Sequence, residues 1–277
     1  MLAIIDGDVL CYQACQARWK IKARNGMNIV SLDDEGVTMP LEYTEEEDRI
    51  YLEDSFDNLL RIVEEVVENN FADDYVMAVK GDGNFRSDLF HEYKLNRANS
   101  KYHSELAKFI PTLRNLLINL EMAIPAHNRE ADDLVRIWAE EARSNGEEFT
   151  ICSIDKDLQC IAGRHYLMHP KYKTVSERIL HVSEQDAMEF YYAQLISGDP
   201  TDNIKGVPGL GPKKAKARIK GKEENDMQYE VVNAYFEAFG EEDWLEQLVV
   251  NGRLIHIQKT VDDYFNPHEW DIVKELT

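Results

Sequence analysis

Acidic residues are the most suggestive feature of this sequence. Glu130, Asp132 and Asp133 fall within four residues, directly ahead of an apolar run at 134–139. Acidic residues suit the first turn of a helix because they interact with the positive end of the helix dipole, and this role alone would account for them. Other carboxylates, however, come after segments that resemble strands: Asp6, Asp82, Asp155, Asp157, Asp199 and Asp202.

Taken together, these carboxylates predict a metal centre. Acidic residues at the ends of parallel strands meet at one edge of the sheet, where open α/β proteins bind ligands. Nine negative charges in one cleft repel each other unless they are far apart and solvated, or are held by cations. Oxygen ligands without His or Cys favour Mg²⁺ or Mn²⁺. Two such ions about 4 Å apart activate a water and stabilise the leaving oxygen in phosphodiester hydrolysis.

The elements that would position these residues follow an alternating pattern. Strand-like segments alternate with helical periodicity, which is typical of parallel βαβ units. The expected strands lie at 2–5, 75–79, 122–125, 149–154, 166–169 and 179–182. The expected helices lie at 9–19, 47–68, 106–120 with an interruption at Pro111, 184–195, 228–238 and 241–250. The acidic stretch 25–57 is interpreted as a solvated face with a hairpin near 28–32.

A basic segment interrupts this acidic chain. The net charge of −21 disfavours non-specific nucleic-acid binding by overall attraction. Residues 86–114 nevertheless carry six Lys or Arg against three acidic residues. Arg86, Lys94 and Arg97 are the candidates for contacts with phosphates, and Lys94 and Arg97 share a helix face at i, i+3. Lys94 and Arg97 would also offset charge on a scissile phosphate.

A second basic signal follows residue 196, where the composition changes. A glycine-rich turn at 206–211 leads into a helical pattern that begins with Pro212, and residues 203–220 hold six basic residues and no acidic one. Such a turn exposes backbone N–H groups that grip a DNA backbone without reading bases. The expected contacts are Gly206, Gly209, Gly211, Lys213 and Lys214.

Composition places further limits on the class of protein. A length of 277 residues with 44% hydrophobic residues fits one large or two small globular domains. The four cysteines lack the spacing of a zinc site, so reduced, buried thiols are expected. The sequence has no charged-then-apolar leader and no apolar run of membrane-spanning length. We therefore expect a cytoplasmic protein (of the host cytoplasm, for a phage protein) without a membrane partner.

Taken in order, these segments resemble the 5′-nuclease family. This family includes flap endonucleases, the 5′-nuclease domain of bacterial DNA polymerase I, and bacteriophage 5′–3′ exonucleases and RNase H-type enzymes. The compact length is most similar to that of a phage member. The matching pieces are Ile4–Gly7, Gly81–Arg86, Tyr93–Arg97, Glu130–Asp133, Ser153–Asp157 and Gly198–Gly211.

The resemblance implies an α/β fold in two parts. A PIN-like parallel-sheet nuclease core would span 1–195, with a basic arch-like segment at 84–120, and a helical helix–three-turn–helix domain would span 196–277 and bind duplex DNA. The implied activity is that of a Mg²⁺-dependent 5′–3′ exonuclease or structure-specific 5′ flap endonuclease in replication or recombination. Its substrate would be duplex or flapped DNA, or the RNA of RNA–DNA hybrids. A monomer with a replication-protein partner is expected.

The family also implies roles for individual residues. The first Mg²⁺ ion, or a Mn²⁺ substitute, would be held by Asp82, Glu130, Asp132 and Asp155. The second ion would share Asp155 and also be held by Asp157, Asp199 and Asp202. Asp6 would sit behind the ions and contact metal-bound water, with Asp133 as a structural neighbour of the ligands.

Other family roles concern DNA. Lys94 and Arg97 would engage the scissile phosphate, as the cations at the base of the family's arch do. The turn Gly206–Gly211 would bind duplex DNA, with a K⁺ ion on its carbonyls. Arg86 would be a further phosphate contact.

Three other interpretations stay open at this point. The opening Ile5–Leu10 resembles that of a haloacid-dehalogenase-like phosphatase, in which Asp6 would be a covalent nucleophile and Asp8 the acid/base. That hypothesis leaves the Tyr93–Arg97 segment and the glycine-rich turn unexplained. A PIN-type nuclease for single-stranded RNA would share the acidic site but would not need the turn. A catalytically inactive DNA-binding scaffold is disfavoured by the near-complete set of carboxylates.

Overall fold

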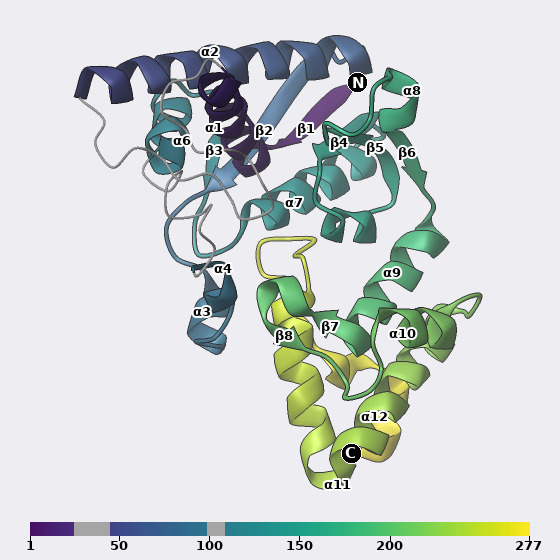
Figure 1. Ribbon diagram of the computed structural model, residues 1–277. Coiled ribbons are helices and arrows are strands. Elements are labelled where there is room, and N and C mark those ends of the chain that lie inside the picture. Colours follow the sequence, from purple (N-terminus) through teal and green to yellow (C-terminus); the bar gives the residue numbers. More distant parts are fainter. Residues whose placement is uncertain (25–44, 99–108) are drawn as a thin grey trace.

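The computed structural model describes residues 1–24, 45–98 and 109–277. The hairpin expected near 28–32 and the start of the helix expected at 106–120 lie outside these ranges. Within them, the chain forms an α/β unit followed by a group of helices (Figure 1). No helix among the described residues is both long enough and apolar enough to span a membrane.

The α/β unit is built on a six-stranded sheet in the order β3-β2-β1-β4-β5-β6. Neighbouring strands from β3 to β5 are parallel, and β6 runs antiparallel to β5. The prediction of a parallel sheet is confirmed, with an antiparallel strand at one edge. The strands are β1 (Leu2–Asp6), β2 (Asp74–Lys80), β3 (Ile124–Ala126), β4 (Phe149–Ser153), β5 (Gly163–Leu167) and β6 (Ile179–Val182).

Both faces of the sheet are covered by helices, as a parallel sheet requires. Because successive side chains of a strand point to opposite faces, Ala3 and Ile5 pack in one core while Ile4 packs in another. The first core is closed by α1 (Gly7–Arg24), α2 (Glu45–Asn70) and α6 (Phe109–Asn119), and the second by α7 (Ala131–Ser144). Each fully buried Ile or Leu contributes roughly 1.5–3 kcal/mol.

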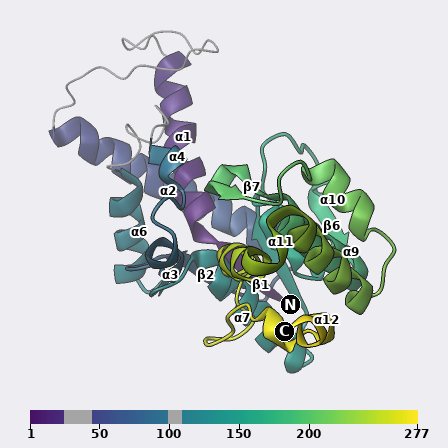
Figure 2. The same cartoon turned by 90° about the horizontal axis from the view of Figure 1, so that it is seen from below.

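The remaining helices form a third core. They are α9 (Glu184–Ser197), α10 (Pro212–Ile219), α11 (Glu224–Ile255) and the short α12 (Asp271–Leu276). Seen from below, α11 and α12 lie together while α1, α2 and α6 form a separate group (Figure 2). The expected domain boundary at 195/196 falls inside α9, whose Tyr192, Leu195 and Ile196 belong to this third core. Because Phe190 of α9 packs against the second core, the boundary stays a prediction, and the residues from α9 onwards are called the helical domain.

Two details of the helices can be compared with the sequence prediction. The two helices expected at 228–238 and 241–250 both lie in α11 and are separated by the non-helical backbone of Gly240, where φ is 76° and ψ is 176°. Only glycine adopts such a backbone at low cost. Pro111 lies in the first turn of α6, where a missing N–H costs little, so it marks a helix start.

The other described elements are short and lie between these helices and strands. They are α3 (Phe85–Leu89), α4 (Leu95–Ala98), α8 (Val175–Arg178), β7 (Gly198–Asp199), β8 (Ile204–Lys205) and the 3₁₀ turns η1 (Asp157–Cys160), η2 (Pro200–Asp202) and η3 (Pro267–Glu269). The four cysteines are buried and free, which confirms the expectation of thiols. Burial raises the pKa of Cys15 to about 11.

Candidate metal centre and nucleic-acid interface

The carboxyl ends of the central strands carry a first group of carboxylates. β1 ends at Asp6, which is buried and only 3% exposed. Asp155 follows the end of β4. Ser153 links the two, because its hydroxyl donates to Asp6 Oδ2 over 2.8 Å and accepts from the N–H of Asp155 over 2.9 Å. Asp132, in the first turn of α7, lies near both. Its pKa is raised well above the usual range by burial and then by the charges of Asp155 and Asp6.

A second group of carboxylates lies where the α/β unit meets the helical domain. Oxygen atoms of Asp157, Asp199 and Asp202 all lie within 4.8 Å of one another, which is close enough for them to share one cation. Gln194 of α9 donates to Asp157 Oδ1 over 2.9 Å, and the N–H of Thr201 donates to Asp199 Oδ1 over 2.8 Å. The helix α9 and the turn that follows it therefore hold this group in place.

One cavity connects the two groups. Five of the seven predicted metal ligands line it: Glu130, Asp132, Asp157, Asp199 and Asp202. Asp155 does not line the cavity itself, but its Oδ1 accepts the N–H of Asp157 over 2.9 Å. The apolar residues that line the cavity are Ile204, Leu254, Ile255 and Ile257.

The electrostatics of these groups fit a bound cation. Burial, followed by the charge of Asp8, raises the pKa of Asp6 to about 7. Burial, followed by the charges of Asp155 and Asp199, raises the pKa of Asp157 to about 7. A positive ion among such carboxylates favours their charged form and removes their repulsion. An all-oxygen donor set of this kind suits a hard divalent ion.

Glu130 faces the cavity from the start of α7 and is held by three donors. Lys94 Nζ lies 2.5 Å from Oε1, Tyr93 Oη lies 3.0 Å from Oε2, and Asn84 Nδ2 lies 3.0 Å from Oε1. Burial favours the neutral form of Glu130, but the charges of Lys94 and Arg86 outweigh it and lower the pKa. Glu130 therefore stays charged.

Lys94 connects the two carboxylate groups. Its Nζ also lies 3.4 Å from Asp202 Oδ2, and its backbone N–H donates to the Asp202 carbonyl over 3.0 Å. The backbone of Lys94 is left-handed, with φ of 58°, and Asn96 fixes the next turn by donating to the carbonyl of Pro200 over 2.9 Å. The segment that carries Lys94 is thus attached to the turn that carries Asp202.

Tyr93 is a residue of the cavity that sequence reasoning missed. Its hydroxyl lies 3.0 Å from Glu130 Oε2 and 3.3 Å from Asp202 Oδ2, so it can donate to a carboxylate of either group. Burial and the same two charges raise the pKa of Tyr93 above its usual range. The available signal was its place beside Lys94 in the Tyr93–Arg97 segment.

Arg86 is placed differently from the prediction. The residue is 2% exposed, and its guanidinium forms two 2.8 Å hydrogen bonds to Asp133. It also donates to the backbone carbonyls of Leu254 and His256. The prediction that Arg86 contacts DNA phosphates is therefore wrong, because its donors are buried and occupied. Asp133 lies behind the cavity, where it accepts the N–H of Glu130 over 2.9 Å.

Asp82 and Arg97 are the remaining predicted residues of the centre. The Asp82 side chain is 86% exposed and contacts His127, which lowers the pKa of Asp82. The short loop after β2 turns back on Asn128, whose N–H donates to the Asp82 carbonyl over 2.7 Å. The structure therefore does not bring Asp82 to the cavity. Arg97 lies in α4, and its side chain is outside the described part of the chain.

The glycine-rich turn lies between β8 and α10. A Cβ on Gly206 would lie 2.1 Å from the carbonyl carbon of Ser197, so the turn packs on the end of α9 only with glycine there. Gly209 has φ of 77°, and the carbonyl of Gly211 accepts the first N–H groups of α10. Lys213 and Lys214 are exposed on the first turn of α10. This basic helix end is open to a large anionic partner.

Comparison with known proteins identifies the family. Residues 1–191 match the family model of the 5′–3′ exonuclease N-terminal resolvase-like domain. The chain therefore belongs to the 5′–3′ exonuclease family, which confirms the resemblance seen in its motifs.

Relatives in this family include polymerases and a free-standing exonuclease. The chain is 33% identical to DNA polymerase I of Rhizobium leguminosarum over 135 residues, which are 47% of this chain and 13% of that protein. It is 28% identical to a 5′–3′ exonuclease of Mycoplasma pneumoniae over 182 residues, which are 61% of this chain and 58% of that protein. The matches thus span only part of these relatives.

Solved structures show the same fold. The T5 D15 protein co-crystallised with metal ions superposes with a TM-score of 0.58 and 16% identity, covering 90% of this chain and 88% of that one. A complex of the bacteriophage T5 flap endonuclease with DNA and metal ions gives a TM-score of 0.52 and 15% identity, covering 92% and 94%. The PIN-like nuclease fold is therefore confirmed.

Proposed function

We propose that this chain is a divalent-metal-dependent nuclease that hydrolyses phosphodiester bonds from the 5′ end of DNA. The observation that carries the proposal is the single cavity in which Glu130 and Asp132 of one domain meet Asp199 and Asp202 of the other, with Lys94 between them. Metal ions are present in the T5 relatives of the same fold, and family membership supports the reaction.

The proposed ions are two Mg²⁺, which Mn²⁺ can replace. Such ions supply an activated water and charge for the leaving oxygen. Glu130, Asp132 and Asp155 would hold the first ion. The second would share Asp155 and would be held by Asp157, Asp199 and Asp202. Asp82 is left out of this set because of its exposure and its contact with His127.

The protein's own residues would position the substrate around these ions. Lys94, just before α4, would exchange its carboxylate partners for an oxygen of the scissile phosphate, and Arg97 in α4 would assist it. Asp6 would orient Asp155 through the Ser153 hydroxyl, which contacts both residues. Tyr93 would hold Glu130 and Asp202 at a fixed separation.

The helical domain would bind the duplex next to the cut. Gly206, Gly209 and Gly211 would offer backbone groups, with a K⁺ ion on their carbonyls, and Lys213 and Lys214 would contact phosphates. We propose duplex and 5′-flapped DNA as substrates, with RNA–DNA hybrids as a second class. A replication protein would be the partner of a monomeric enzyme in the cytoplasm.

A cleavage assay tests the proposed function. Purified full-length protein is incubated with 5′-labelled blunt, nicked, flapped and hybrid duplexes at low salt, with Mg²⁺ or with EDTA. We expect products from the 5′ end with Mg²⁺ only, and the pattern among substrates defines the preferred class. Asp155→Asn should abolish cleavage and leave duplex binding intact. Uncut substrate at every Mg²⁺ concentration would contradict the proposal.

The duplex-binding role of α10 has a separate test. Lys213→Ala with Lys214→Ala removes two phosphate contacts, so duplex affinity should fall and the slope of log affinity against log salt should decrease by about 2. Fluorescence anisotropy at several salt concentrations measures both quantities. Lys171→Ala with Lys173→Ala, which changes exposed lysines between β5 and α8, is the matched control. An unchanged salt slope in the α10 variant would remove α10 from the interface.

The phosphatase interpretation has no support from the geometry. It requires Asp8 as a free acid/base, but Asp8 forms an ion pair with Arg114, whose Nη2 lies 2.7 Å from Oδ1. Asp8 also accepts the backbone N–H of Lys80. The carboxylate that the hypothesis needs is therefore already engaged in joining α1 to β2 and α6.

A further inference from the structure

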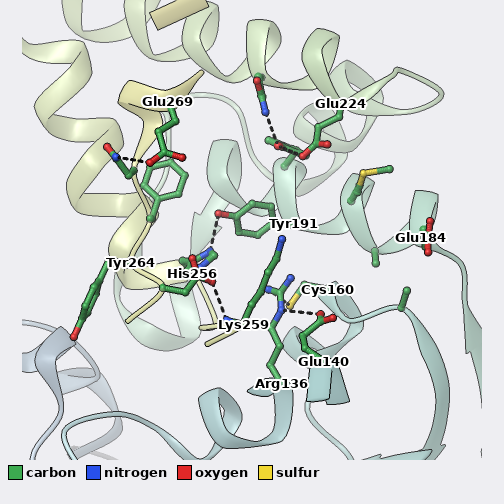
Figure 3. A pocket seen from close by; sticks show the side chains of 18 of the residues that line it. Arg136, Glu140, Cys160, Glu184, Tyr191, Glu224, His256, Lys259, Tyr264 and Glu269 are labelled. Atoms are coloured by element: carbon green, nitrogen blue, oxygen red, sulfur yellow. Dashed lines mark hydrogen bonds and ion pairs between the residues drawn. The ribbon is translucent and has the colours of Figure 1, made fainter. Parts of the chain in front are cut away.

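We propose that the segment after α11, residues 256–265, positions the carboxylates of the metal centre. We call it the C-terminal strap. It lies beyond residues 1–191, which match the family model, and the inference rests on the proposed nuclease function. Figure 3 shows His256, Lys259 and Tyr264 of the strap beside a cavity of about 980 Å³ that is also lined by residues of α7 and α9.

The strap supports Asp133 from behind the metal centre. The N–H of Gln258, a residue that is 1% exposed, donates to Asp133 Oδ1 over 2.9 Å. Arg86 gives the same carboxylate two hydrogen bonds and is itself oriented by the carbonyls of Leu254 and His256. Three of the four hydrogen bonds to Asp133 therefore depend on residues 254–258.

The fourth hydrogen bond transmits this support to the ligands. The N–H of Glu130 donates to Asp133 Oδ2 over 2.9 Å, and Asp133 shares the first turn of α7 with Asp132. Further along α7, Arg136 Nη1 donates to the carbonyl of Ile257 over 3.0 Å. The strap thus holds α7 at two successive turns, and a shift of the strap would move the carboxylates of Glu130 and Asp132.

Asp263 closes the strap on itself. Its Oδ2 lies 2.9 Å from His256 Nε2 and accepts the N–H of Lys259 over 2.8 Å. His256 Nδ1 lies 3.1 Å from the hydroxyl of Tyr191, which joins the strap to α9 (Figure 3). Without the Asp263 carboxylate, the loop from His256 to Asp263 loses both of these contacts, and Gln258 loses the closed loop that presents its N–H to Asp133.

A purely structural strap makes a different prediction from a positioning strap. If the strap only joins the two domains, its variants lower stability and duplex affinity together and leave ion affinity in the folded protein unchanged. If it positions Glu130 and Asp132, its variants weaken ion binding in a folded protein whose metal-free duplex affinity is unchanged. Mutation of a residue that orients a metal ligand typically lowers metal affinity or activity by about 10- to 100-fold.

The decisive comparison is Asp263→Ala against Asp262→Ala. Both remove one negative charge from the strap, but Asp262 is exposed and its side chain forms no hydrogen bond to any of the described residues. Mn²⁺ binding to the full-length protein is measured by the electron paramagnetic resonance of free Mn²⁺, and duplex binding by anisotropy in EDTA. We expect ion binding about 10- to 100-fold weaker in Asp263→Ala and unchanged in Asp262→Ala.

A second pair of variants, both at Gln258, isolates the contact with Asp133. Gln258→Pro removes the donated N–H, whereas Gln258→Ala keeps it, so only the first should carry the full loss of Mn²⁺ affinity. Asp263→Asn replaces Asp263→Ala if circular dichroism shows that the alanine variant is unfolded. Unchanged Mn²⁺ affinity in folded Asp263 and Gln258→Pro variants would overturn the strap's role. Absence of Mn²⁺-dependent cleavage by the wild type would instead contradict the proposed function.

Discussion

Two ion pairs, Arg86–Asp133 and Lys94–Glu130, have their carboxylates within one turn at the start of α7 but differ in exposure to solvent. The side chains of Arg86 and Asp133 are 2% and 0% exposed, whereas those of Lys94 and Glu130 are 25% and 19% exposed. In both pairs burial favours the neutral carboxyl, and the cation outweighs it and lowers the pKa. Arg86 and Glu130 both line the cavity, but the first pair is buried and enclosed by backbone carbonyls, whereas the second is partly exposed.

This difference separates structure from chemistry among similar residues. Arg86 has partners on every side, so moving it would leave Asp133 charged and buried. Lys94 contacts carboxylates of both groups, which a divalent ion would neutralise, so its ammonium can turn to a phosphate. Basic residues of one segment, both close in sequence to Asp82, therefore differ. Arg86 is buried and bonded to Asp133 and two backbone carbonyls, whereas Lys94 is partly exposed and contacts the carboxylates of Glu130 and Asp202.

The largest effect on stability should come from breaking the enclosed Arg86–Asp133 pair. Arg86→Met leaves an unpaired buried carboxylate, so the free energy of unfolding should fall by about 3–5 kcal/mol. Urea denaturation followed by circular dichroism measures this loss. Adding Asp133→Leu to Arg86→Met should recover part of it, since the unpaired charge is removed. A loss as small as that of a surface variant would show that Arg86 is not structural.

Breaking the Lys94–Glu130 pair should affect cleavage more than stability. Lys94→Met should reduce kcat by about 10²- to 10³-fold, the range seen when one preorganised donor to a transition state is lost. The free energy of unfolding should change by no more than about 1 kcal/mol, as for a partly exposed ion pair. Single-turnover cleavage and urea denaturation provide the two measurements, with Lys94→Arg as the charge-preserving control. Destabilisation equal to that of Arg86→Met would erase the distinction between the pairs.

A third pair is about as exposed as the Lys94–Glu130 pair and should have the smallest effect. The side chains of Asp263 and His256 are 30% and 10% exposed. Burial of Asp263 is outweighed by hydrogen bonds from His256 and the Lys259 N–H, which lower its pKa from 3.8 to about 2. A carboxyl whose pKa is lower in the folded protein than in the unfolded chain stabilises the fold at pH values above the unfolded-state pKa. This stabilisation is lost as the pH falls through the folded-state pKa.

The free energy of unfolding of Asp263→Asn should therefore be lower than that of the wild type by about 1–2 kcal/mol near pH 7. The difference should persist down to about pH 4 and close towards pH 2. Urea denaturation at a series of pH values tests this, with Asp262→Asn as the control. A difference that grows on acidification would mean that His256, and not the Asp263 carboxylate, governs the contact.

Much of the α/β unit could be predicted because its signals are local. Apolar periodicity and strand ends placed Asp6, Asp155 and Asp157 correctly on the sheet's carboxyl edge, since parallel strands bring such residues together. The meeting of Asp157 with Asp199 and Asp202 depended on the family resemblance. No local pattern shows how the helical domain docks on the sheet.

The errors arose where the outcome depended on long-range packing. Arg86 lies in the first turn of the short, N-capped helix α3, which gives no sign that residues 254–258 enclose it from the far end of the chain. Asp82 follows a strand like the other carboxylates, but its shortened loop folds back on Asn128 and directs it to solvent. No periodicity in the sequence predicts the strap, because its order comes from contacts with α7 and α9.

The edge strand β3 has a consequence for how the molecules behave in concentrated solution. It is three residues long, pairs only with β2 among the described strands, and has Pro125 at its centre. A proline offers no N–H, and so short an edge presents few free backbone groups to another chain. Ile124, although 49% exposed, therefore lies on an edge that resists the strand-to-strand pairing with which β-sheet aggregation begins.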